Sequence, residues 1–325
     1  MFRPEAVPLP ALVTAGAVAL FAVTIGVGAT LLPGGFAPGP ALTGFLLVSP
    51  LLVVAGLHLQ QTARLQRLGK VAETLGFYLL LCLTSMLATA ALAIRSGPYI
   101  DPVLIAMDAR LVPWFDYVES LEWLASRPAV FAAASHVYGS LTWQPVALIV
   151  AAVAWGRPSD LTRMTTCWAI GLALCIMPFA WLPAQSPYVW YGITPADLPG
   201  LRNALPFTFF PILEGLRDGS IDTLSLETTT GMVTIPSFHA CGAVMLAWLW
   251  WPYRAMRWPM VALNAGMGIS AIPIGSHYVI DIVAGIGVAA IAIWATRRIA
   301  PTAEWPHSPN RLSVTPAWHM ANSPR

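Results

Sequence analysis

The sequence predicts an all-α fold, a polytopic membrane helix bundle with about eight transmembrane helices. Of the 325 residues, 57% are hydrophobic and only 10% are charged, whereas a soluble domain carries about 25% charged residues. Apolar runs long enough to cross a bilayer, roughly 20 residues each, also recur along the chain. The candidate spans are 11–32, 43–60, 72–94, 129–155, 164–184, 234–252, 257–274 and 278–297.

The first two spans form an N-terminal pair, residues 1–71, which we expect to lie outside the core of the protein. The run 11–32 is longer than the core of a typical signal peptide and lacks a clear cleavage site, so it is predicted to be a retained helix. Pro50 interrupts the second span, which membrane helices tolerate. Residues 72–298 contain the other six spans and are predicted to form the core.

Two long segments between spans, 95–128 and 185–233, are predicted to form a cap at one side of the bundle. Residues 101–126 mix aromatic and charged residues at near-helical spacing, which indicates an amphipathic interfacial helix. The second segment is rich in proline and aromatic residues, so we expect a structured cap at the lipid headgroup level, with a flexible loop as the alternative. Residues 299–325 are polar and proline-rich and are predicted to form a disordered cytoplasmic tail.

The basic residues divide unequally if eight spans alternate. One side holds Arg3, Arg64, Arg67, Lys70, Arg157, Arg163, Arg254, Arg257, Arg297, Arg298, Arg311 and Arg325, and the other holds Arg95, Arg110, Arg127, Arg202 and Arg217. The richer side is expected to be cytoplasmic, which places both termini inside and the cap outside. Every basic residue except Lys70 is an arginine; this suggests a GC-rich bacterial genome, and hence the inner (plasma) membrane.

Two short runs carry ionisable residues in strongly apolar surroundings. His239 lies in the run Ile235–Ala240, and His277 and Asp281 lie in the run Gly275–Asp281. An ionisable group within a membrane segment costs a few kcal/mol and is a functional candidate by default. These three residues are therefore the predicted catalytic residues.

His277 and Asp281 are four residues apart, about 6 Å along a helix axis, and share a helix face. The carboxylate can accept a hydrogen bond from one imidazole nitrogen, which leaves the other nitrogen as a nucleophile or base. A buried pair that serves only structure is the alternative.

His239 follows Pro236, a residue favoured in the first turn of a helix, and Thr234 or Ser237 could cap that turn. The N-terminus of a helix is a ready anion site. A histidine there could reach a bound phosphate, although a lone structural histidine is the alternative reading.

Together these residues predict phosphoryl transfer. His277 would attack phosphorus with Asp281 orienting it, and His239 would protonate the leaving alcohol and then activate the incoming water or alcohol. We expect no cofactor and no metal, because no Cys/His metal spacing occurs. The four cysteines fall inside apolar runs and are expected to be small core residues.

The two runs resemble motifs of the phosphatidic acid phosphatase type 2 superfamily. Its best-known members have Lys-x6-Arg-Pro, then Pro-Ser-Gly-His, then Ser-Arg-x5-His-x3-Asp. Here Pro236, Ser237, His239 and His277-x3-Asp281 are present. The chain departs from the pattern in three places: Phe238 replaces the glycine, Ala271 replaces the arginine after Ser270, and Leu182–Tyr188 lacks the first motif. These departures resemble the branch related to inositol phosphorylceramide synthase and sphingomyelin synthase. The resemblance covers about residues 72–298, a six-helix phosphatase-like core, and the segment 97–145 is similar as well, including Asp101, Asp108, Tyr138 and Gln144.

The missing arginines leave open what binds the phosphate. Ser237, the N–H groups at the start of the helix and Arg202 are the candidates, with Arg110 and Arg127 as other cations on the same side. His136 and Gln144 could line a headgroup pocket, or they could form hydrogen bonds between helices.

Three functions follow from these observations. The first is a lipid phosphatase that acts on a lipid phosphate or diphosphate at the outer face. The second is a lipid headgroup transferase that uses the same phosphohistidine with an alcohol acceptor. The third is a transporter or scaffold, although repeats typical of transporters are not evident. The expected partners are a lipid phosphate or phospholipid substrate and the bilayer. A nucleic acid is not expected, because the chain has no basic block.

Overall fold

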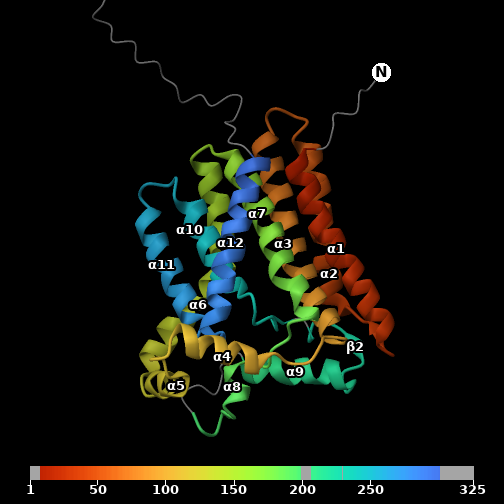
Figure 1. Cartoon of the computed structure of the whole chain (residues 1–325). Coiled ribbons are helices and arrows are strands. Elements are labelled where there is room, and N and C mark those ends of the chain that lie inside the picture. Colours follow the sequence, from red (N-terminus) through yellow and green to blue (C-terminus); the bar gives the residue numbers. More distant parts are fainter. Residues whose placement is uncertain (1–7, 199–205, 229, 301–325) are drawn as a thin grey trace, which may run out of the picture.

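The computed structural model describes residues 8–198, 206–228 and 230–300. Within them, helices occupy all eight predicted spans, and the all-α membrane bundle is confirmed (Figure 1). These helices are α1 (Leu9–Leu31), α2 (Gly39–Leu59), α3 (Gln66–Ala93), α6 (Pro128–Ala154), α7 (Pro158–Ile176), α10 (Phe238–Trp250), α11 (Arg257–Ser270) and α12 (Val279–Ile299).

Among the described helices, six are long and apolar enough to cross a membrane: α1, α2, α3, α6, α12, and α7 together with the short 3-10 helix η1 (Met177–Ala180). Helices α10 and α11 have only 13 and 14 residues, so they are shorter than the predicted spans 234–252 and 257–274. Pro236 and Pro273 lie just outside them and disfavour continued helix. The candidate catalytic residues therefore lie at helix ends and not in the middle of a span.

The N-terminal pair packs on the rest of the bundle through small residues. Helices α1 and α2 both contact α3, and α1 also contacts α7. A Cβ atom at Gly28 would overlap the side chain of Ala91, and one at Gly56 would overlap the backbone of Glu73. Small residues at such crossings let membrane helices approach closely. The division of the chain at residue 71 stays a prediction.

The main core lies among α3, α6, α7, α10 and α12. It contains the fully buried Trp168, and the cysteines Cys167, Cys175 and Cys241 are buried in it and unpaired. Residues 301–325, which hold almost all of the predicted tail, lie outside the described residues.

The cap lies at one end of the bundle, and the turns that join α2 to α3, α6 to α7 and α10 to α11 lie at the other (Figure 1). The elements at the cap end are α4 (Asp101–Leu111), α5 (Tyr117–Ala125), α8 (Pro187–Trp190), α9 (Pro206–Asp218), β1 (Gly35–Phe36) and β2 (Thr223–Leu224). The single interfacial helix predicted over 101–126 is thus two helices. Pro113 lies between them, where its ring and its missing N–H oppose helix.

Contacts distant in sequence join the two cap segments to each other and to the link between α1 and α2. Strands β1 and β2 pair in parallel, which joins the link between α1 and α2 to the segment after α9. Arg217 of α9 donates to the hydroxyl of Ser96 and to the carbonyl of Gly97, and Tyr99 donates to the Glu214 carboxylate. The described part of 185–233 therefore has defined structure.

Candidate active site

His277 and Asp281 meet at the start of α12. Nδ1 of His277 lies 3.3 Å from Oδ2 of Asp281, and the same oxygen accepts the Tyr278 N–H at 2.9 Å. Both side chains are buried, with 4% of His277 and none of Asp281 exposed. His277 lies just before the helix, which begins at Val279, so the prediction that the two residues share a helix face is wrong. Asp281 reaches His277 from the first turn. The contact leaves Nε2 of His277 without a hydrogen-bond partner among the described residues.

The turn before His277 is held by the cap. Tyr117 of α5 donates to the carbonyl of Ile272 at 3.1 Å, and Tyr188 of α8 donates to the carbonyl of Pro273 at 2.8 Å. The His277 N–H in turn lies 3.2 Å from the Ile272 carbonyl oxygen. The position of the imidazole therefore depends on two buried tyrosines from elements far away in sequence.

Two aspartates of α4 hold the first turn of α12. The Asp108 carboxylate accepts the N–H groups of Val279 and Ile280, each at 2.8 Å. Asp101 accepts the Tyr278 hydroxyl at 2.7 Å and also the backbone N–H groups at 185 and 186. Seven residues are about two helical turns, so both carboxylates lie on one face of α4.

Burial raises the pKa of the half-buried Asp108, and its two backbone hydrogen bonds partly oppose that rise. In the sequence these aspartates stood out only as part of the segment similar to the family. Their seven-residue spacing in an amphipathic helix indicates that the two carboxylates share a face. The spacing does not show which groups that face contacts.

Helix α10 begins beside this turn, and Ser237 joins the two. Oγ of Ser237 accepts the Ala240 N–H at 3.3 Å, so Ser237 and not Thr234 caps the helix. The Ser237 N–H donates to the Asp281 carbonyl at 3.0 Å. A Cβ atom at Gly285 of α12 would overlap the Ser237 carbonyl oxygen. The structure therefore brings together the two sequence runs that carry the histidines.

His239 lies in the first turn of α10 and stacks on Tyr138 of α6. The ring centroids are 3.7 Å apart and the planes are inclined by 16°. Tyr138 is buried, and its ring also fills the space where Gly275 has no side chain, since a Cβ there would lie 2.8 Å from Cε2. Tyr138 thus connects His239 to the turn before His277. Sequence reasoning placed this tyrosine in the similar segment but gave it no role.

The two helix N-termini differ in the N–H groups they leave free. Those of Tyr278, Val279 and Ile280 are taken by Asp281 and Asp108. Those of Phe238 and His239 at the start of α10 have no hydrogen-bond acceptor among the described residues. Free N–H groups at a helix start favour an anion, so the start of α10, and not that of α12, has N–H groups available to an anion.

The predicted cations do not join the histidines within the described structure. Arg202 lies outside the described residues. Arg127 lies over the Trp123 ring, 4.4 Å from its centroid, and donates to the Trp123 carbonyl. Arg110 is exposed and has no hydrogen bond or ion pair to any residue described. Neither Arg110 nor Arg127 contacts His239 or His277.

The two candidate pocket residues of α6 have other neighbours. His136 is exposed, and its Nδ1 lies 2.7 Å from the carbonyl oxygen of Ala132 in the same helix. Gln144 is buried and exchanges hydrogen bonds of 3.2 and 3.0 Å with Asn264 of α11. Gln144 therefore makes a hydrogen bond between helices, as the alternative prediction had it. The pocket roles of His136 and Gln144 stay predictions.

These features define a helical membrane protein with a buried His–Asp pair and a second histidine at the capped end of its bundle. Residues 102–295 match a family model described as the PAP2 superfamily. Because the match covers more than half of the 325 residues, the chain belongs to this superfamily.

The match confirms the resemblance at the level of the superfamily. Its members are phosphatases and phosphotransferases, which identifies the chain as an enzyme of this kind. The matched region runs from α4 to α12, so α1, α2 and α3 precede it. A search of curated proteins and a search of solved structures returned no significant match.

Proposed function

We propose that the protein is a lipid phosphatase or phosphotransferase that acts on a lipid phosphate or phosphodiester through a phosphohistidine, without a metal. The contact that carries the proposal joins Nδ1 of the buried His277 to Asp281. It favours the tautomer with the proton on Nδ1, so the Nε2 lone pair is available. The carboxylate also stabilises the positive charge that the ring gains during attack.

The proposed reaction has two steps. In the first, Nε2 of His277 attacks phosphorus, the bond from phosphorus to the leaving oxygen breaks, and His239 gives that oxygen a proton. In the second, neutral His239 takes a proton from water or an alcohol, whose oxygen attacks phosphorus as the phosphorus–nitrogen bond breaks. The Tyr138 stack supports this role because it holds the His239 ring in one plane.

Phosphate binding would use the free N–H groups at the start of α10. Ser237 supports this arrangement as the cap of the helix. Arg202 remains our candidate cation. Such donors act by stabilising charge that develops in the transition state.

The acceptor distinguishes the phosphatase from a headgroup transferase. The departures at Phe238 and Ala271 favour the branch that resembles inositol phosphorylceramide and sphingomyelin synthases, in which an alcohol accepts the phosphoryl group. The residues that make the intermediate are the same for water and for alcohol.

The site is proposed to face the outside of a bacterial inner membrane, with both termini in the cytoplasm. Arg64, Arg157, Arg254 and Arg298 lie in turns and helix ends away from the cap, at the end opposite His277 (Figure 1). A basic excess normally marks the cytoplasmic side.

Purified protein in detergent, given labelled lipid phosphates and diphosphates with and without alcohol acceptors, tests the proposal. We expect phosphate release or headgroup transfer, loss of all turnover in His277→Ala, and near-complete loss in His239→Ala. Both variants should keep the thermal unfolding profile of the wild type. Full activity in either folded variant would rule out the mechanism. Rapid quenching should also trap an acid-labile phosphoryl group on the wild type but not on His277→Ala.

A further inference from the structure

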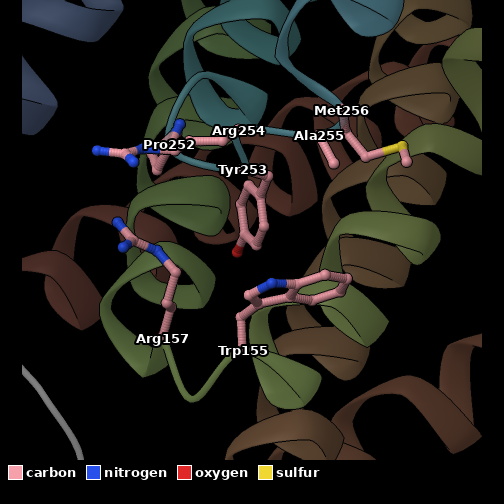
Figure 2. A pocket seen from close by; sticks show the side chains of 7 residues that line it. All are labelled: Trp155, Arg157, Pro252, Tyr253, Arg254, Ala255 and Met256. Carbon is pink, nitrogen blue, oxygen red and sulfur yellow. The ribbon is translucent and has the colours of Figure 1, made fainter.

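A pocket lies at the end of the bundle away from the cap. A pocket of about 410 Å³ is formed there by the turn between α6 and α7 and the turn between α10 and α11 (Figure 2). Helix α10 runs from His239 at the active site to Trp250 beside this pocket. At 1.5 Å per residue His239 and Trp250 are about 17 Å apart along the helix axis, so the pocket is separate from the candidate active site.

One cation of the pocket is fixed by a buried carboxylate. Nε of Arg157 lies 2.5 Å from Oδ2 of Asp160, and the same oxygen accepts the Tyr253 hydroxyl at 2.9 Å. The Arg157 side chain is 36% exposed, and its Cζ lies 5.7 Å from the centroid of the Tyr253 ring. The ion pair therefore holds the guanidinium in place while part of the side chain stays exposed.

A second cation has no such partner. Arg254 is exposed and makes no hydrogen bond or ion pair with any residue in the described ranges. Figure 2 shows the guanidinium groups of Arg157 and Arg254 on the same side of the Tyr253 ring. Tyr253 itself is buried, with Trp155 packed edge-on against it at 5.8 Å. An anion in this pocket would meet two guanidinium groups, whose planar donors suit phosphate oxygens.

Tryptophans place the pocket at a membrane interface. Trp155, Trp251 and Trp258 are exposed by 63%, 45% and 66%, and exposed tryptophans concentrate at the headgroup level of a bilayer. Basic pockets between transmembrane helices at this depth suit anionic lipid headgroups. The pocket therefore opens where phosphate groups are abundant.

We propose that this pocket binds a phosphate group, carried by an anionic phospholipid or free in solution, on the membrane side opposite the active site. The site depends on Arg157 and Arg254 and takes no part in the proposed phosphoryl transfer. Its ligand is bound and not turned over.

Native mass spectrometry of the full chain with phosphatidylglycerol tests this site, and inorganic phosphate serves as the second probe. All proteins carry His277→Ala, so that no turnover removes the lipid. Arg254→Gln should retain phosphatidylglycerol about fivefold more weakly, as expected for one arginine near a membrane surface. Arg298→Gln is the matched control, since it removes the same charge at the same end but from α12, where Arg298 lies over Trp294.

Loss of bound phosphatidylglycerol in Arg254→Gln, with retention of the lipid in Arg298→Gln, supports the site. If inorganic phosphate displaces the bound lipid, free phosphate is also a ligand of the pocket. If it does not displace the lipid, the ligand is the lipid headgroup. Equal retention in all variants, or equal loss in both, would overturn the proposal, because equal loss reports only the general surface charge. In the background with His277 intact, Arg254→Gln should keep wild-type turnover. A negative result in the lipid-binding test would therefore leave the proposed function unaffected.

Discussion

Asp108 lies outside the proposed catalytic trio, and its contacts hold the helix that follows His277. Its carboxylate caps the helix that begins two residues after the histidine, and it lies on α4 instead of α12. A cap of this kind contributes about 1 kcal/mol to stability. Its loss here would also let the first turn of α12 move relative to α10.

Asp108→Asn is expected to lower kcat at least tenfold and to reduce the free energy of unfolding by about 1–2 kcal/mol. The amide keeps one acceptor but turns an N–H donor toward the second backbone N–H. Steady-state kinetics with thermal unfolding measures both effects. The control is Asp116→Asn, which makes the same substitution at the cap of α5, where Asp116 accepts the Glu119 N–H at 3.0 Å. A similar loss of kcat in the control would contradict a specific role for Asp108.

Tyr138 is the residue that holds the second histidine. Its ring stacks on His239, and its hydroxyl has no hydrogen-bond partner among the described residues. Tyr138→Phe should therefore keep nearly all activity. Tyr138→Leu should lower kcat by about two- to tenfold, the size of an aromatic pair contribution. Measuring kcat of both variants at the same pH tests this role. An equal loss of kcat in Tyr138→Phe and Tyr138→Leu would contradict the role of the ring stack.

At the scale of elements, the candidate active site depends on the close approach of α10 and α12. Gly285 makes the approach possible, because any side chain there would meet the Ser237 carbonyl. The same carbonyl accepts the Cys241 N–H at 3.0 Å, which is the first i→i−4 hydrogen bond of α10. A shift of α12 would thus disturb both histidine-bearing segments together.

Gly285→Ala should destabilise the protein by about 1–3 kcal/mol, the usual cost of overpacking, and should lower activity. Gly287→Ala is a matched control on the same helix, since a Cβ atom there meets nothing within 4 Å. Thermal unfolding in detergent compares the two. Equal melting temperatures would show that the helices can separate without cost.

At the scale of the whole molecule, the cap and the basic turns occupy opposite ends of the bundle (Figure 1). Residues such as Ser126 in the cap and Thr62 in the turn between α2 and α3 should therefore face opposite sides of the membrane. The native cysteines Cys167, Cys175 and Cys241 are buried, which leaves introduced cysteines as the accessible thiols in these regions.

Ser126→Cys should react with a membrane-impermeant maleimide in intact cells, and Thr62→Cys only after lysis. The physical reason is the excess of arginine at the end of the bundle that contains Thr62, because segments rich in basic residues are retained in the cytoplasm. Gel-shift labelling reads out both, with the unsubstituted chain as the background control. The reverse pattern would place the active site in the cytoplasm.

The bundle itself could be predicted from sequence because the bilayer imposes one simple rule on composition. A span needs roughly 20 apolar residues, and the runs that became α1, α2, α3, α6 and α12 satisfy it. The ends of α10 and α11 were missed because apolar composition continues past Pro236 and Pro273 although helix does not. Apolar composition indicates which residues lie within the bilayer, whereas proline and backbone hydrogen bonding decide where a helix ends.

The sequence by itself determined the class of protein, the superfamily and the pairing of His277 with Asp281, since four-residue spacing is local and needs no fold. Only the tertiary structure decided that Ser237 bonds to the Asp281 carbonyl, that Tyr138 stacks on His239, and that Asp108 caps α12. These contacts join residues 44 to 172 positions apart. Such contacts leave no period or spacing in the chain, because they form only when packing of the apolar helices brings their polar ends together.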